Sequence, residues 1–139
     1  AVKGGNNNVT LKKSLGKSLE DYLEVILILQ HKGGMVRSID VADYMGFSKP
    51  SISRAVKELK AKGLLITDRN NFLHLTDTGK LIAEKIYERH CFFTKYLIKM
   101  GVDPKLAESD TYKLEHVISD ESFQKLKEST RIWSEKEEV

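Results

Sequence analysis

The stretch SKPSISRAVKELKAK, residues 48–62, has the pattern of a helix with two unlike sides. Ser48 suits the N-cap position and Pro50 suits the first turn, where a missing backbone N–H costs nothing. At helical spacing, one side is apolar and carries Ile52, Val56 and Leu59. The other side combines short hydroxyls with positive charge, a combination that fits the major groove of DNA. The residues that we expect to contact DNA from this helix are Ser48, Lys49, Pro50, Ser51, Ser53, Arg54 and Lys57.

The flanking segments complete the order of a winged helix-turn-helix. Helices are expected at 18–33 and 38–44 before this stretch, and at 78–100, 105–118 and 120–135 well after it. Between the 48–62 stretch and the helix expected at 78–100, two β-prone runs at 64–67 and 72–76 surround a polar turn and predict a hairpin. Arg69 at the tip of this hairpin is a further expected DNA contact. The sequence therefore predicts a mainly α fold with a small β-hairpin. We expect a flexible arm at 1–17, a DNA-binding domain at 18–77 and an all-helical domain at 78–139.

Composition agrees with a folded, DNA-binding chain. Of the 139 residues, 40% are hydrophobic and 31% are charged, which is enough for a core and too apolar for a disordered chain. The first 80 residues carry 13 Lys and Arg against 8 Asp and Glu, whereas the rest carry 10 against 12. A basic first part suggests a polyanion as partner. The single cysteine, Cys91, and the short apolar run at 25–29 favour a cytoplasmic protein without a membrane span.

Acids and histidines form a second pattern. Asp21 and Glu24 are three residues apart and project from one side of the first helix, His90 lies midway along the long helix, and Glu115-His116 ends the next helical segment. Carboxylates with imidazole suit a first-row divalent ion, and the predominance of oxygen favours Mn²⁺ or Fe²⁺ over Zn²⁺. Each residue also has an ordinary explanation, as a partner of the helix dipole, a core histidine or a surface pair.

Five pieces of the chain together resemble one family of metal-dependent regulators. SLEDYLE at 18–24 resembles the opening helix of the diphtheria-toxin-repressor family, and most closely that of its manganese-transport-regulator branch. SKPSISRAV at 48–56 resembles the recognition helix, and LTDTGK at 75–80 the hairpin-to-helix junction. LEHVISDE at 114–121 resembles the Glu-His ligand motif, and His90 falls where the family has a ligand histidine. The resemblance covers about residues 18–130.

The resemblance implies a homodimeric repressor that binds a double-stranded DNA operator and controls genes of metal-ion homeostasis. Its residues 78–139 would bind metal and dimerise. The implied metal ligands are Asp21, Glu24, His90, Glu115 and His116. Asp21 stands where the iron-responsive branch has a methionine, and this harder ligand favours manganese.

Tyr112 departs from the family pattern. The manganese branch has a glutamate at this position, so a two-metal cluster would lose a carboxylate here, although the backbone carbonyl of Tyr112 can still coordinate. Glu108, one helical turn earlier, is a possible extra metal ligand. We therefore expect one site made by Asp21, Glu24, Glu115, His116 and the Tyr112 carbonyl, whereas a second site around His90 lacks a ligand.

Two other interpretations compete with a metal-dependent repressor. A winged-helix transcription factor that responds to a non-metal ligand would explain the basic helix but not the acids and histidines. A small metallo-hydrolase would use the same candidate ligands to activate water. The sequence has no phosphate-binding glycine loop, no His-Glu-x-x-His motif and no nucleophile motif, so we expect no enzymatic activity.

Overall fold

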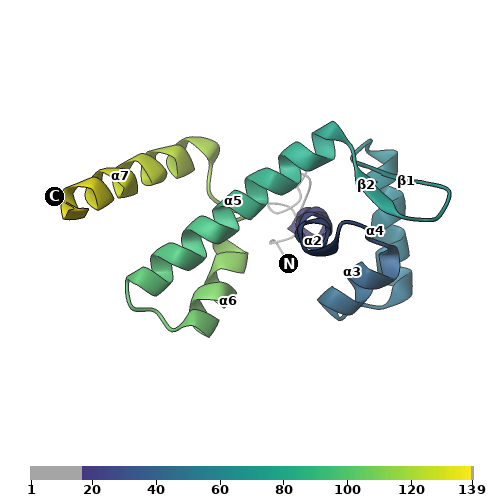
Figure 1. Cartoon of the computed structure of the whole chain (residues 1–139), viewed down its shortest axis with the longest axis horizontal. Helices are drawn as coiled ribbons and strands as arrows, with labels where there is room; N and C mark the ends of the chain where they lie inside the picture. Colours follow the sequence, from purple (N-terminus) through teal and green to yellow (C-terminus); the bar gives the residue numbers. More distant parts are fainter. Residues whose placement is uncertain (1–16, 139) are drawn as a thin grey trace, which may run out of the picture. The chain divides into compact units, whose positions relative to one another are not determined.

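The computed structural model describes the backbone of residues 17–138 and the side chains of residues 19–131, so the predicted arm lies outside the described residues except for Lys17. The helices and strands, shown in Figure 1, are α2 (Lys17–Gly33), α3 (Ser38–Met45), α4 (Lys49–Ala61), β1 (Leu65–Thr67), β2 (Leu73–Leu75), α5 (Asp77–Lys99), α6 (Pro104–Leu114) and α7 (Asp120–Glu138). The chain forms two compact units, the first ending at Tyr87 and the second beginning at Glu88, so α5 contributes to both. In the described part of the chain, no helix is long and apolar enough to span a membrane.

Helix α2 is the centre of the first unit. Leu23, Ile26 and Leu27 on this helix are at most 2% exposed, and α2 contacts α3, α4 and β2. A helix that is apolar on most sides is stable only when other elements surround it. The core therefore forms around α2, and it includes Val36 from the loop after α2 and Val41, Ile52, Leu59, Leu65 and Leu73 from the other elements.

The turn from α3 into α4 follows the predicted local signals. Gly46 ends α3 in the left-handed conformation, with φ 71°, which a residue with a side chain rarely adopts. Ser48 is the N-cap of α4, its Oγ accepting a hydrogen bond from the backbone N–H of Ser51 at 3.3 Å, and Pro50 lies in the first turn. The cap and the start of α4 are thereby confirmed.

The hairpin has an antiparallel register that pairs Leu65 with Leu75, Ile66 with His74 and Thr67 with Leu73. Its turn is organised by Asp68. The Asp68 carboxylate accepts hydrogen bonds from the backbone N–H groups of Asn70 at 2.9 Å and Phe72 at 3.0 Å, and it pairs with His74 Nε2 at 2.8 Å. One side chain therefore stabilises the turn from within, as aspartate commonly does.

The junction between the hairpin and α5 is tightly packed. Thr76 caps α5 by accepting a hydrogen bond from the Gly79 N–H at 3.1 Å, and its hydroxyl donates to the Gly63 carbonyl at 2.8 Å. A Cβ atom on residue 79 would lie 2.0 Å from the Leu64 carbonyl oxygen. Glycine is therefore required at 79 by the close approach of the two backbones.

The second unit contains the later part of α5 with α6 and α7. Phe123 in the first turns of α7 is 2% exposed and packs against Phe92 and Phe93 of α5. The prediction that the preceding helix continues to residue 118 is wrong, because α6 ends at Leu114 and residues 115–117 form a turn. The following Ser119 accepts a hydrogen bond from the Ser122 N–H at 3.1 Å, so the chain has already turned to begin α7.

Candidate metal centre and nucleic-acid interface

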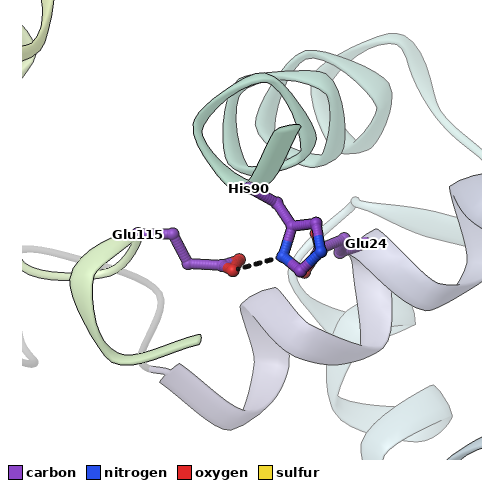
Figure 2. Close-up of side chains that lie close together, drawn as sticks. All are labelled: Glu24, His90 and Glu115. Carbon is purple, nitrogen blue, oxygen red and sulfur yellow. Dashed lines mark hydrogen bonds and ion pairs between the residues drawn. The ribbon is translucent and has the colours of Figure 1, made fainter. Parts of the chain in front are cut away.

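His90 and Glu115 form a hydrogen-bonded pair in the second unit. His90 comes from α5 and Glu115 is the residue that follows α6, and Nδ1 of the imidazole lies 2.9 Å from Oε1 of the carboxylate (Figure 2). Glu115 is fully buried, and its Oε2 atom has no hydrogen-bond partner among the described residues. A buried carboxylate oxygen without a partner is costly, and a bound cation would offset that cost. The pair therefore fits a metal ion.

Tyr112 packs against the histidine of this pair. Its ring lies edge-on to the His90 imidazole, with centroids 5.3 Å apart, and the residue is 37% exposed. His116 is half-buried in the turn beside Glu115, whereas Glu108 is exposed on α6. Among the described residues of the second unit, His90 thus contacts both Glu115 and Tyr112, and Glu108 does not join His90 and Glu115 in a cluster of ligand atoms.

Asp21 and Glu24 are one turn apart on α2 in the first unit, where Asp21 is half-buried and Glu24 is 2% exposed. Buried carboxylates are rare unless they are paired or bind metal, so Glu24 is a functional candidate. Burial also raises the pKa of the neighbouring Tyr22 phenol; Arg54 opposes this rise and Asp21 adds to it. The Tyr22 hydroxyl is therefore influenced by two charges, that of the candidate metal ligand Asp21 and that of Arg54 on the helix expected to contact DNA.

The donor atoms of these residues match a hard or borderline divalent ion. Carboxylate oxygens outnumber imidazole nitrogens, and the one cysteine is exposed rather than placed with them. Such a set suits Mn²⁺ or Fe²⁺. The hydrogen bond to Glu115 also fixes the orientation of the His90 ring.

Helix α4 presents the candidate nucleic-acid interface. Ile52, Ala55 and Leu59 are buried on its inner side. The predicted contacts lie on the other side, where Ser51 is half-buried and the exposed residues are Ser48, Lys49, Pro50, Ser53, Arg54 and Lys57. Arg69 is exposed at the hairpin turn, also as predicted. A shallow groove of about 270 Å³ runs along the exposed side and is lined by Ser38, Ser53, Val56, Lys57 and Lys60.

Two residues beside this interface were missed from the sequence. Ser38 lines the groove from α3, and Arg37 stacks on the ring of Phe72 with its guanidinium carbon 4.3 Å from the centroid. Arg37 and Phe72 also form an isolated antiparallel bridge, which attaches the start of α3 to the hairpin. No local pattern signals this contact, because the two residues are far apart in the sequence.

Comparison with known proteins places this chain in one class, the winged helix-turn-helix regulators with a metal-binding domain. Residues 14–71 match the family described as "Iron dependent repressor, N-terminal DNA binding domain". Residues 76–132 match "Iron dependent repressor, metal binding and dimerisation domain". The chain therefore belongs to the iron-dependent repressor family, which is the diphtheria-toxin-repressor family that its motifs resemble.

Individual relatives agree with this family. The transcriptional regulator MntR of Escherichia coli O6:H1 is 31% identical over 105 residues, which cover 76% of this chain and 68% of the relative. The HTH-type transcriptional regulator MntR of Lysinibacillus sphaericus is 25% identical over 122 residues, or 88% of each chain. The solved structure of the manganese regulator SloR superposes with a TM-score of 0.73 at 25% identity and covers 81% of this chain and 53% of that one. This chain thus spans about half the length of SloR, and likewise about half of the solved metal-dependent transcriptional regulator MtsR.

These matches confirm the predicted fold class and family. The family is described as iron-dependent and SloR is a manganese regulator, and iron and manganese are the two metals predicted from the ligand chemistry. The family consists of DNA-binding regulators with a dimerisation domain, so the prediction that this chain is not an enzyme is confirmed as well.

Proposed function

We propose that this chain is a metal-activated repressor of transcription that senses Mn²⁺ or Fe²⁺ and controls genes of metal-ion homeostasis. It acts as a homodimer on a double-stranded DNA operator in the cytoplasm. The observation that carries the proposal is Glu115, a buried carboxylate with one oxygen on His90 and the other without a partner in the described structure. We assign DNA binding to residues 18–77, and metal binding and dimerisation to residues 78–139.

The proposed metal ligands come from both units. The first unit supplies the carboxylates of Asp21 and Glu24 on α2. The second unit supplies His90, Glu115 and His116 with the backbone carbonyl of Tyr112. The burial of Glu24 and Glu115 supports this set, because a metal ion compensates carboxylates that are held away from water. Figure 2 draws three of these side chains, Glu24, His90 and Glu115.

The proposed DNA contacts come from the exposed side of α4 and from the hairpin. Arg54 bridges the O6 and N7 acceptors of a guanine, while Ser51 and Ser53 allow close approach to the base edges. Lys49, Lys57 and Arg69 contact phosphates, which gives affinity without sequence preference. The exposure of Arg54, Lys57 and Arg69 supports these roles.

Metal binding and DNA binding are coupled through the arrangement of the two units. Without metal, the carboxylates of Asp21, Glu24 and Glu115 repel one another when the units approach. A bound divalent ion replaces this repulsion with attraction, so it narrows the range of arrangements that the units adopt. In a dimer, a fixed arrangement sets the spacing of the two recognition helices and so favours one operator geometry.

Two ligand substitutions test the proposal. Glu24→Ala and His116→Ala should abolish metal-dependent DNA binding, and Glu84→Ala, an exposed acid on α5, should not. The readout is fluorescence anisotropy with a labelled duplex that the wild-type protein selects from a random pool in the presence of Mn²⁺. The coupling scheme is wrong if both ligand variants keep a metal-responsive affinity. A flat response of the wild-type protein to Mn²⁺, Fe²⁺ and chelator would instead indicate a regulator of the non-metal class.

The number of ions per subunit tests the role of Tyr112. We expect anaerobic calorimetric titration of chelator-treated protein with Mn²⁺ or Fe²⁺ to saturate near one equivalent. Tyr112 offers only a carbonyl where a carboxylate would complete a second site, and its ring packs against His90. Saturation at two equivalents would mean that Glu108 or water completes the second site.

A further inference from the structure

Arg89 is a buried cation next to His90 on α5. The residue is 4% exposed, and its guanidinium makes three kinds of contact. Nη1 donates a hydrogen bond to the Ile118 carbonyl oxygen at 2.6 Å, and Nη2 forms an ion pair with the Asp120 carboxylate. The guanidinium carbon also lies 5.1 Å from the centroid of the Phe123 ring. A buried charge is retained only where such contacts compensate the loss of water, so Arg89 has a defined structural task.

The contacts of Arg89 fix the far end of the turn that carries the candidate ligands. Glu115 begins this turn, and its N–H donates to the Thr111 carbonyl at 2.9 Å, which anchors it to α6. Ile118 and Asp120 lie just beyond the turn, where Arg89 anchors them to α5. The turn is therefore held at both ends by neighbouring helices.

Arg89 and His90 act on the same loop from adjacent positions of one helix. His90 contacts Glu115 at the start of the turn, and Arg89 contacts residues 118–120 after it. Because both contacts start from the same turn of α5, any shift of the loop must change both. We propose that Arg89 is a positioning residue for the metal centre: by holding residues 118–120 it keeps the Glu115 carboxylate in register with the His90 imidazole. This inference rests on the proposed function, since it concerns the affinity of the same site.

The geometry of arginine is required for this role. A guanidinium can donate to a carbonyl and pair with a carboxylate at once, while its plane packs over an aromatic ring. A lysine keeps the charge, but its three N–H donors share one nitrogen and it has no planar group, so it cannot span the two partners of Nη1 and Nη2 while it packs over the Phe123 ring. Substitution by lysine therefore separates the charge of Arg89 from its positioning role.

Lys127 offers a matched control. It joins the same two helices, since its Nζ lies 2.5 Å from Oε2 of Glu88 on α5 and 5.0 Å from the Phe123 ring centroid on α7. Its described contacts do not include residues 115–120. A loss of contact between α5 and α7 would affect variants of Lys127 and of Arg89 alike, whereas a loss of loop position would affect variants of Arg89 and Asp120 and leave a variant of Lys127 unchanged.

The experiment compares Arg89→Lys, Asp120→Asn and Lys127→Met in the full chain. For each we would measure the Mn²⁺ Kd by competition with a fluorescent chelator, the Mn²⁺ electron paramagnetic resonance line shape and the thermal midpoint of the metal-free protein. We expect Arg89→Lys to weaken Mn²⁺ binding about 10- to 100-fold, the usual effect of losing an outer partner of a metal site, and to broaden the spectrum. Asp120→Asn should weaken Mn²⁺ binding in the same direction but by less, because the Asp120 side chain is 69% exposed. Lys127→Met should keep the wild-type Kd and line shape.

The possible outcomes are distinct. If Arg89→Lys and Asp120→Asn both keep the wild-type Kd, the positioning role is overturned. It is also overturned if the Kd of all three variants simply follows their thermal midpoints, because that pattern describes general destabilisation. If the wild-type protein itself binds no Mn²⁺ or Fe²⁺, the proposed function fails at its first step, and this inference fails with it.

Discussion

The two units of the chain differ in what they bury. The buried residues described in the first unit are apolar apart from Glu24, and they surround α2. In the second unit, the buried residues Phe93, Ala107 and Phe123 are accompanied by Arg89, Thr111 and Glu115. The first unit therefore gains its stability mainly from apolar burial, whereas the second holds charged and polar groups in its interior.

This difference determines where a substitution can alter function without lowering the stability of the fold. In the first unit, the predicted DNA contacts lie on the surface and the core lies behind them, so DNA binding and stability involve different residues. In the second unit, the candidate metal ligands and the interior are partly the same residues. We therefore expect changes at the DNA-reading face to leave stability intact, and changes at the metal centre to alter the response of stability to metal.

The largest effect is expected in the core of the first unit. Leu59 on α4 is fully buried, and Leu59→Ala should lower the free energy of unfolding by about 2–5 kcal/mol through lost burial and the cavity left behind. Arg54→Ala on the exposed side of the same helix should change the free energy of unfolding by less than about 0.5 kcal/mol while weakening DNA binding. Urea denaturation and DNA anisotropy measure the two effects. A comparable destabilisation by both substitutions would show that the core and the DNA-reading face of α4 are not energetically separate.

The next effect concerns the second unit. Glu115→Gln keeps the volume of the side chain and can still hydrogen-bond to His90, but it removes the charge that a metal ion requires. At 100 times the Kd, metal should stabilise the wild-type protein by about 2.7 kcal/mol, and this gain should disappear in the variant. The exposed Glu121→Gln at the start of α7 is the control. Thermal unfolding with Mn²⁺ and with chelator gives the comparison, and a full metal response in Glu115→Gln would show that this carboxylate is not a ligand.

Backbone packing in the first unit gives a third, smaller effect. Gly79→Ala places a Cβ atom 2.0 Å from the Leu64 carbonyl oxygen, so α5 must shift against the hairpin at a cost of about 1–3 kcal/mol. Gly33→Ala, at the end of α2, meets no atom within 4 Å and should be neutral or slightly stabilising. Chemical denaturation of both variants tests the contrast, and equal stabilities would mean that the junction is not a close contact.

Local signals made the first unit predictable from sequence. Ser48, Pro50 and the apolar spacing of Ile52 and Leu59 act within one helix, so they locate its start and its inner side without reference to other elements. Thr76 and Gly79 similarly fix the junction with α5 over a few residues. The same reasoning also predicted which side of α4 is exposed.

The second unit was less predictable because its contacts join distant residues. Leu114, Val117 and Ile118 fit a helical stripe, so the sequence favoured a helix that continues to residue 118. In the structure the helix ends at Leu114, and the carbonyl oxygen of Ile118 instead accepts a hydrogen bond from Arg89 of α5. The family resemblance implied both His90 and Glu115 as ligands, but it placed them in two different sites, so their hydrogen-bonded pairing was not predicted. The role of Arg89 had no local signal at all, since its partners lie about 30 residues further on.

The smallest expected effect involves an ionic contact on the surface of the first unit. Hydrogen bonds from His74 and from the backbone N–H of Phe72 hold the pKa of the Asp68 carboxyl below its usual value. Because the folded-state pKa is the lower one, this contact stabilises the fold above the unfolded-state pKa, which is about 3.9, and the stability is lost as the pH falls through the folded-state value.

Asp68→Asn should therefore remove a small part of the acid sensitivity of unfolding below about pH 4, and leave the pH dependence nearer neutrality unchanged. The effect is small because the pair is exposed and water screens it, in contrast to the buried charges of the second unit. Urea midpoints measured across this range test the expectation, with the exposed Asp43→Asn of α3 as the control. Identical acid profiles for the wild-type protein and Asp68→Asn would show that the charge of Asp68 does not contribute to stability, and that its side chain holds the turn only as a neutral hydrogen-bond acceptor.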